Sequence, residues 1–193
     1  MVPLTSSLSG RRLLLGVSGS IAAYKAAALT RLLVQAGAEV QVILTEAASA
    51  FVTPLTLGTL SKKPVLTGFL RDAAAGEWHN HVELGLWANA LLIAPASANT
   101  VGQLAQGLCP NLLSAVYLSA RCPVFLAPAM DLDMYAHPAV TQNLQRLRSF
   151  GNHVFDSPSG ELASGLVGPG RMLEPEAIVR ELEHYFDPKT GDS

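Results

Sequence analysis

Residues 12–25 read RLLLGVSGSIAAYK, and this stretch decides the fold. Its apolar first part, residues 13–17, is typical of a short buried strand. Glycine and serine follow, and then residues 22–35, rich in alanine and leucine, predict a helix that stops at Gly37. Residues 39–44 predict the next strand. A strand, a helix and a strand joined by short links form a βαβ unit, so we expect a parallel sheet.

The same alternation continues to the end of the chain. Further strands are predicted at residues 90–94, 124–127 and 153–155, and helices at 100–119 (with a break at Pro110), 138–150 and 174–186. The pattern predicts a doubly wound α/β fold, with a mostly parallel sheet and helices on both faces. Two segments fall outside it: residues 62–80, interpreted as a mobile loop, and the glycine-rich residues 156–173, interpreted as a functional flap.

Composition limits the classes of function. Of the 193 residues 49% are hydrophobic and only 15% charged, against about 25% charged in typical domains, which suggests surface buried against a partner subunit or ligand. A net charge of −2 makes a nucleic-acid or anionic-membrane partner a poor hypothesis. We find no signal-peptide pattern and no apolar run long enough to span a bilayer, so we expect a cytoplasmic protein. Two cysteines predict free buried thiols, with neither a disulfide framework nor a metal site.

Unusual turns follow the first two predicted strands, at the sheet edge where ligands bind to such folds. In the first turn, Gly19 and Ser20 precede a helix, where backbone N–H groups and the helix dipole favour an anion. The spacing is not that of a dinucleotide-binding turn, and a purely structural tight turn explains it equally well. In the second, Thr45 follows the strand and Phe51 lies nearby. The Thr45 hydroxyl could bind phosphate, or it could cap the next helix.

Two later strands end in turns that contain proline. Residues 95–100 read PASANT, and their small side chains suit close approach of the backbone to a flat or bulky group. Residues 128–135 read PAMDLDMY and place Asp131 at the sheet edge, between Met130 and Met134. Helix capping is the alternative interpretation for Asp131. His81 precedes a short predicted helix and could act as an acid or base, although a lone histidine is more often structural.

Together these motifs identify a resemblance. The order GSIAAYK, Thr45, His81, PASANT, PAM-x-x-x-M and GPGRM resembles the flavin-dependent cysteine decarboxylases over residues 11–186. PASANT and the PAM turn are specific for the wider family. The flap sequence of residues 162–172 is similar to the branch that acts on 4′-phospho-N-pantothenoylcysteine, which occurs as a lone enzyme or as the first half of a bifunctional protein of coenzyme A biosynthesis.

The resemblance implies a Rossmann-like flavoprotein that binds FMN between the subunits of a homotrimer, which can assemble further into a dodecamer. Residues 11–186 would be the FMN-binding decarboxylase domain, with residues 156–173 as its substrate flap. Residues 1–10 would be an extension and residues 187–193 a tail or the start of a linker to a synthetase domain. In the family reaction, FMN oxidises the cysteinyl thiol to a thioaldehyde, CO₂ leaves, and the reduced flavin returns the hydride to give 4′-phosphopantetheine.

The resemblance also assigns roles to individual residues. His81 would be catalytic, near the substrate carboxylate and thiol and across a subunit boundary, and the flap position that usually protonates the intermediate is Ser164. The cofactor would contact Gly19, Ser20, Ile21, Thr45, Phe51, Ser97, Ala98, Asn99 and Thr100. The substrate would contact Asp131, Met134 and Arg171, of which Arg171 would bind its phosphate.

Two departures from the family pattern affect the chemistry. Asp131 replaces an asparagine that grips the substrate carboxylate, and an ionised Asp131 would repel that group. Ser164 replaces a cysteine and is a much weaker acid, so a water or Glu161 could donate the proton instead. These departures keep three alternatives open: a flavin-binding regulatory or interaction protein without catalysis, a decarboxylase of peptide C-terminal cysteines, and a Rossmann-like module without flavin.

Overall fold

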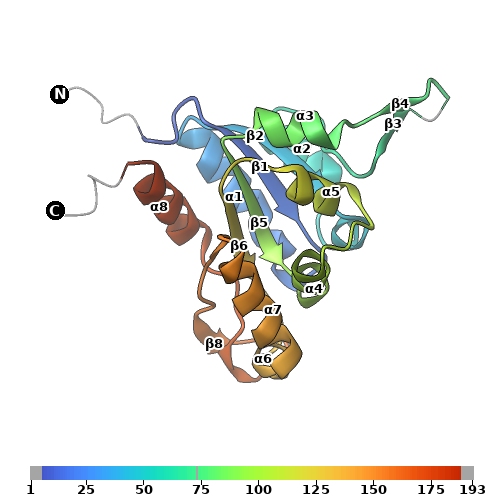
Figure 1. Cartoon of the computed structure of the whole chain (residues 1–193). Coiled ribbons are helices and arrows are strands. Elements are labelled where there is room, and N and C mark those ends of the chain that lie inside the picture. Colours follow the sequence, from blue (N-terminus) through green and yellow to red (C-terminus); the bar gives the residue numbers. More distant parts are fainter. Residues whose placement is uncertain (1–5, 73, 188–193) are drawn as a thin grey trace, which may run out of the picture.

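The computed structural model describes residues 6–72 and 74–187. At its centre is a five-stranded parallel sheet with the strand order β2-β1-β5-β6-β7 (Figure 1). The strands are β1 (Arg12–Val17), β2 (Glu39–Leu44), β5 (Ala90–Ala96), β6 (Val124–Pro128) and β7 (His153–Val154). In the register, Leu13 of β1 lies opposite Val40 of β2 and Ala90 of β5. The predicted doubly wound fold is confirmed.

Helices cover both faces of this sheet (Figure 1). One apolar core joins the sheet to α1 (Lys25–Gln35), α2 (Pro54–Ser61) and α8 (Pro175–Phe186). The other joins it to α3 (His81–Trp87), α4 (Ala98–Gln106), α5 (Leu112–Ser119) and α7 (Pro138–Ser149). Three short helices, η1 (Ile21–Tyr24), η2 (Glu46–Ala50) and α6 (Leu132–Ala136), follow strands β1, β2 and β6. The predicted break at Pro110 is confirmed, since it separates α4 from α5.

Strand β1 shows why the central strands are apolar throughout. Leu13 and Leu15 point into the core formed with α1, whereas Leu14 points into the core formed with α5. A side chain at Gly16 would place its Cβ 2.4 Å from Leu113 Cδ1, so the glycine lets α5 approach the sheet. A strand covered on both faces needs a continuous apolar run instead of an alternating one.

Two segments differ from the sequence-based interpretation. Residues 62–80, expected to be a loop, contain an antiparallel hairpin of β3 (Leu70–Asp72) and β4 (Glu77–Trp78), which extends away from the sheet (Figure 1). The flap contains a second hairpin, β8 (Ser159–Glu161) and β9 (Val167–Pro169). Strands of two or three residues are too short to show the alternation that identifies a strand in sequence.

The chain ends and the cysteines add three observations. Within the predicted N-terminal extension, Leu8 is fully buried and the Ser7 hydroxyl donates to the Glu183 carbonyl at 2.9 Å. Residues 1–5 and 188–193, which belong to the predicted extension and tail, lie outside the described residues. Both cysteines are free, but the expectation that both are buried is wrong, because Cys109 is exposed. Every helix within the described ranges is too short or too polar to cross a lipid bilayer.

The buried Ser18 hydroxyl joins the turns that follow β1 and β5. It donates to the carbonyl of Pro95 at 2.7 Å and accepts from the Ser97 N–H at 2.9 Å. The Ser18 N–H also donates to the Pro95 carbonyl, at 3.3 Å. The peptide bond between Ala94 and Pro95 is cis. One small side chain therefore holds together the two turns at the carboxyl edge of the sheet.

We expect Ser18→Ala to lower the free energy of unfolding by about 1–3 kcal/mol, because it leaves the buried Ser97 N–H without its acceptor. Urea unfolding followed by circular dichroism measures the change. The control is Ser149→Ala, which removes an exposed hydroxyl bond to the Arg146 carbonyl and should cost much less. Equal losses for the two variants would contradict the role given to Ser18.

Candidate functional site

The turn after β1 leaves a backbone donor open. The Ser20 side chain caps η1 by accepting from the Ala22 N–H at 3.3 Å, whereas the Gly19 N–H has no acceptor among the described residues. A Cβ on Gly19 would lie 2.6 Å from the Cβ of Ala47, so only glycine lets this turn touch the turn after β2. The arrangement suits a bound anion or carbonyl near Gly19.

The other predicted turns divide between capping and open positions. Thr45 accepts from the Ala48 N–H at 3.3 Å and Ser97 from the Thr100 N–H at 3.4 Å, so the helix-capping interpretation of Thr45 is confirmed and Ser97 has the same role. Asp131 occupies the N-cap position of α6, but its side chain makes no capping hydrogen bond. The capping interpretation of Asp131 is therefore wrong, and its carboxylate is available to a ligand.

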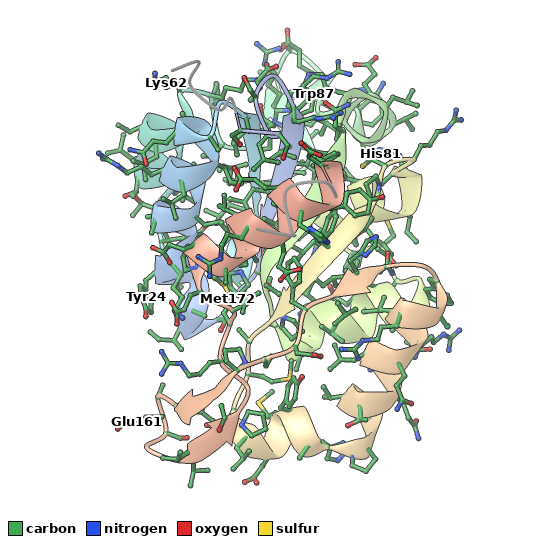
Figure 2. The ribbon with its side chains drawn as sticks, turned by 90° about the vertical axis from the view of Figure 1, so that its left-hand side faces the viewer. Tyr24, Lys62, His81, Trp87, Glu161 and Met172 are labelled. Atoms are coloured by element: carbon green, nitrogen blue, oxygen red, sulfur yellow. The ribbon has the colours of Figure 1, made fainter. Side chains whose placement is uncertain are left out.

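A cavity of about 520 Å³ opens between the turn after β1, the turn after β6 and the flap. Figure 2 shows Tyr24 and Met172 close together in this region, with Glu161 farther out on the flap. The lining residues are Ser20, Ile21, Ala22, Tyr24, Lys25, Ala129, Met130, Asp131, Glu161, Leu162, Ala163, Gly170, Arg171 and Met172. Of the residues predicted for the site, the cavity brings together Ser20, Ile21, Asp131 and Arg171.

The remaining predicted site residues lie outside the cavity lining. They are Gly19, Thr45, Phe51, His81, Ser97, Ala98, Asn99, Thr100, Met134 and Ser164. Ser164 stands at the exposed tip of the flap, where its hydroxyl accepts from the Leu166 N–H at 3.4 Å. Sequence analysis missed Tyr24 and Lys25 as lining residues, although both belong to the quoted GSIAAYK motif, one helical turn beyond Ser20.

One glutamate neutralises both cations of the cavity. Lys25 is buried, and its Nζ donates to Glu174 Oε1 at 2.7 Å and to the Met172 carbonyl at 3.3 Å. Arg171 Nη2 donates to the same Glu174 oxygen at 3.3 Å. The hydrogen bond from Lys25 is the largest cause of a lowered pKa at Glu174, reinforced by both positive charges and opposed by desolvation. Glu174 is thus held ionised although it does not line the cavity.

The carboxylates of the cavity are not neutralised. Within the described residues, neither Asp131 nor Glu161 has an ion pair or a side-chain hydrogen bond. The Met130 N–H donates to the Gly170 carbonyl at 3.0 Å, which joins the segment carrying Asp131 to the segment carrying Arg171. A Cβ on Gly170 would lie 2.4 Å from the Met130 carbonyl oxygen, so this crossing requires glycine.

His81 belongs to a different surface of the molecule. It begins α3, and its ring lies 5.7 Å from the ring of Trp78 and 6.5 Å from that of Phe69 between centroids. Figure 2 shows His81 well separated from Tyr24, Met172 and Glu161. Among the described residues, its Nδ1 is the one buried side-chain polar atom without a hydrogen-bond partner. Within one chain, then, His81 and the cavity form two separate parts of a site.

The fold and the cavity define a class of α/β protein that binds a ligand at the carboxyl edge of a parallel sheet. No three His, Cys, Asp or Glu side chains in the described parts are grouped to hold a metal ion. The family model described as Flavoprotein matches residues 1–186, and the chain belongs to this family. The chain is therefore built for a flavin.

Two curated relatives are similar in sequence. A cysteine/cysteine sulfinic acid decarboxylase from an unknown prokaryotic organism is 59% identical over 138 residues, which are 72% of this chain and 38% of that protein. The coenzyme A biosynthesis bifunctional protein CoaBC of Vibrio cholerae is 47% identical over 183 residues, 95% of this chain and 46% of that protein. The chain thus spans less than half the length of these relatives.

Two solved structures share the fold over nearly their whole length. A PPC decarboxylase variant complexed with pantothenoylaminoethenethiol has a TM-score of 0.82 and 33% identity, covering 92% of this chain and 99% of that one. The FMN-binding protein AtHal3 has a TM-score of 0.80 and 32% identity, covering 92% and 97%. The predicted resemblance to flavin-dependent decarboxylases is confirmed.

The pairing of Glu174 predicts an acid-dependent stability. Because its native pKa is lowered from 4.5, its contribution is complete above 4.5 and is lost as the pH falls through the native value. We expect Glu174→Gln to be less stable than the parent at neutral pH and to lose less on acidification. Urea unfolding at neutral pH and below pH 4.5 measures this. Glu181→Gln, on the exposed side of α8, is the control, and a parent-like acid response in Glu174→Gln would contradict the prediction.

Proposed function

We propose that this chain catalyses the FMN-dependent decarboxylation of 4′-phospho-N-pantothenoylcysteine to 4′-phosphopantetheine, a step of coenzyme A biosynthesis. The observation that carries the proposal is the cavity between the turn after β1, the turn after β6 and the flap, in a fold that matches a PPC decarboxylase over 99% of its length. The similarity to CoaBC proteins over 95% of this chain supports the same reaction.

FMN is the cofactor we propose, held by residues of three turns at the sheet edge. The open Gly19 N–H and the close contact between Gly19 and Ala47 fit a phosphate or ring carbonyl there. Ser20, Ile21, Thr45 and Phe51 would complete this part, and Ser97, Ala98, Asn99 and Thr100 would face the ring system. When bound, FMN supplies the two-electron oxidation of the cysteinyl thiol that makes loss of CO₂ easy, and then returns the electrons.

The chain's own residues bind and orient the substrate. We assign residues 156–173 as the flap that covers it, with Arg171 and Met134 as contacts, within an FMN-binding domain at residues 11–186. Arg171 keeps N–H donors for a substrate anion because its Glu174 contact uses a single nitrogen. We assign delivery of the proton to the flap, where Glu161 lines the cavity and Ser164 stands at the tip.

We propose that His81 reaches the cavity of a neighbouring copy in a homotrimer or a multiple of it. Two observations support this arrangement: the partnerless buried Nδ1 of His81 and the exposed apolar residues around it. Leu70 is 64% exposed and Trp78 51%, on the hairpin that extends from the sheet, and Val82 and Leu86 of α3 are also exposed. A neighbouring subunit would cover this surface.

Cellular context and domain organisation follow the same proposal. The bifunctional relatives are more than twice as long as their match to this chain, so we propose that a synthetase domain can follow Ser193, with residues 187–193 leading into it. The cytoplasm is the proposed compartment, and neither nucleic acid nor a membrane is a proposed partner.

A substrate assay tests the function. We expect FMN-loaded protein under nitrogen to convert synthetic 4′-phospho-N-pantothenoylcysteine to 4′-phosphopantetheine and CO₂, measured by mass spectrometry. His81→Asn should lower kcat by a factor on the order of 10²–10⁴, as expected for loss of an acid–base group. A yellow parent protein that forms no product would overturn the proposal and favour the regulatory alternative. Turnover of a cysteine-ended peptide instead would favour the peptide decarboxylase.

Hybrid assemblies test whether the site is shared between copies. Ile21→Trp should fill the cavity from an exposed position and inactivate the protein. Coexpressed with His81→Asn, it should regain activity at about a quarter of the sites, because some cavities then face an intact histidine of a neighbour. Hybrids as inactive as their parents would place His81 and its cavity in the same chain.

The exposed hairpin predicts a second effect on assembly. We expect Trp78→Glu to shift the protein from a trimer or its multiple towards a monomer, because a buried charge replaces a large apolar contact. Light scattering measures the mass. Leu55→Glu, at a leucine of α2 that is 81% exposed, is the control and should keep the parental mass. A parental mass for Trp78→Glu, or a monomeric parent, would refute the proposed interface.

A second candidate substrate is a cysteine whose amino group is free. The 59% identical relative named for cysteine decarboxylation favours it. The specific observation in this chain is Asp131, whose unpaired carboxylate stands where the resemblance places an asparagine. The same flavin chemistry applies to both substrates, which differ at the nitrogen next to the departing carboxylate.

A further inference from the structure

The charges in the cavity are unevenly compensated. Both cations, Lys25 and Arg171, are bound to Glu174. Both anions, Asp131 and Glu161, line the cavity without a counter-ion among the described residues. A cavity with uncompensated carboxylates attracts a cationic group and opposes a ligand that carries only negative charge.

The position of Asp131 relative to Arg171 makes this attraction specific. The hydrogen bond from Met130 to Gly170 joins the two segments one residue before each of these side chains. Asp131 and Arg171 nevertheless form no ion pair with each other, since Arg171 binds Glu174 instead. A carboxylate and a guanidinium on joined segments, both lining one cavity, fit a ligand with an ammonium and a carboxylate on the same carbon.

We propose that this cavity takes free L-cysteine as a substrate and that Asp131 is the specificity-determining residue that binds its α-ammonium group. Arg171 binds the α-carboxylate with the donors that Glu174 leaves free, and Glu161 adds negative charge at the flap. The inference rests on the proposed decarboxylase function and adds to it a substrate class, the un-acylated cysteine. An N-acylated cysteine has an uncharged amide at this place and presents only its carboxylate to Asp131.

The reaction balances with the proposed cofactor alone. The thiol gives up two electrons and two protons in total, and the bond from the α-carbon to the carboxylate breaks, with its electron pair moving towards sulfur. The two electrons then return with two protons, of which one comes from solvent. The net change is L-cysteine plus a proton to cysteamine plus CO₂, and the flavin ends in its starting state.

Binding of unreactive analogues tests the recognition without any turnover. L-Serine has the ammonium and carboxylate of cysteine but no thiol, and N-acetyl-L-serine lacks the ammonium. Calorimetry with the FMN-loaded protein should show serine binding that weakens roughly tenfold or more in Asp131→Asn, the size expected for loss of a charged hydrogen bond. N-Acetyl-L-serine should bind Asp131→Asn at least as well as the parent. Higher salt should weaken serine binding to the parent.

The matched control is Asp133→Asn, an exposed aspartate in the first turn of the same helix that does not line the cavity. It should leave both affinities unchanged. Glu161→Gln is a second variant on a separate segment and should weaken serine binding less than Asp131→Asn does. Flavin content and circular dichroism verify that each variant is folded. Serine binding that is undetectable in the parent, or equal in Asp131→Asn and the parent, would overturn the proposal.

Turnover separates this inference from the function on which it rests. The parent should release CO₂ from L-cysteine, and Asp131→Asn should shift the ratio of kcat/KM towards 4′-phospho-N-pantothenoylcysteine by tenfold or more. CO₂ from the acylated substrate alone, with a ratio that Asp131→Asn does not change, would refute the inference and leave the proposed function intact. No CO₂ from either substrate would refute the proposed function, while the serine measurements would still decide whether Asp131 binds an ammonium group.

Discussion

Burial of the central strands on both faces is the constraint on which the rest of this structure depends. Because β1 and β5 are covered by helices on each side, the sheet has no exposed face on which to build a site. Its polar groups are confined to the carboxyl ends of the strands, where the chain must turn. Ser18 holds two of these turns together through one hydroxyl, so the geometry of the candidate site depends directly on the packing of the sheet.

Charge in the cavity is controlled from outside it. Glu174 does not line the cavity, yet it is hydrogen-bonded to both cations that do. Without this contact, Lys25 and Arg171 would balance Asp131 and Glu161, and the cavity would favour neither sign of ligand. With it, the carboxylates are the unpaired charges. A residue at the start of α8 thereby influences which substrates the turn after β6 can accept.

The separation of His81 from the cavity gives the hairpin of β3 and β4 a purpose in the proposed assembly. The hairpin supplies Trp78, which packs against the His81 ring and remains half exposed. A histidine in such a position can contact a substrate only if another chain brings a cavity to it. Catalysis and oligomerisation are then a single requirement, since the same apolar surface that joins two copies would complete the site.

The sequence by itself determined the fold and the location of the chemistry. Apolar runs such as residues 13–17, followed by glycine, serine or proline, were sufficient to predict a parallel sheet with its site at one edge, because strand burial and turn chemistry are local properties. The resemblance carried by PASANT and the PAM turn identified the flavoprotein family for the same reason: these residues are contiguous. The hairpin of β3 and β4 escaped prediction because its strands are too short to show a period. Only the tertiary structure decided that Asp131 does not cap its helix, that Glu174 occupies both cations and that His81 lies away from the cavity, because each depends on which residues distant in sequence lie close together in space.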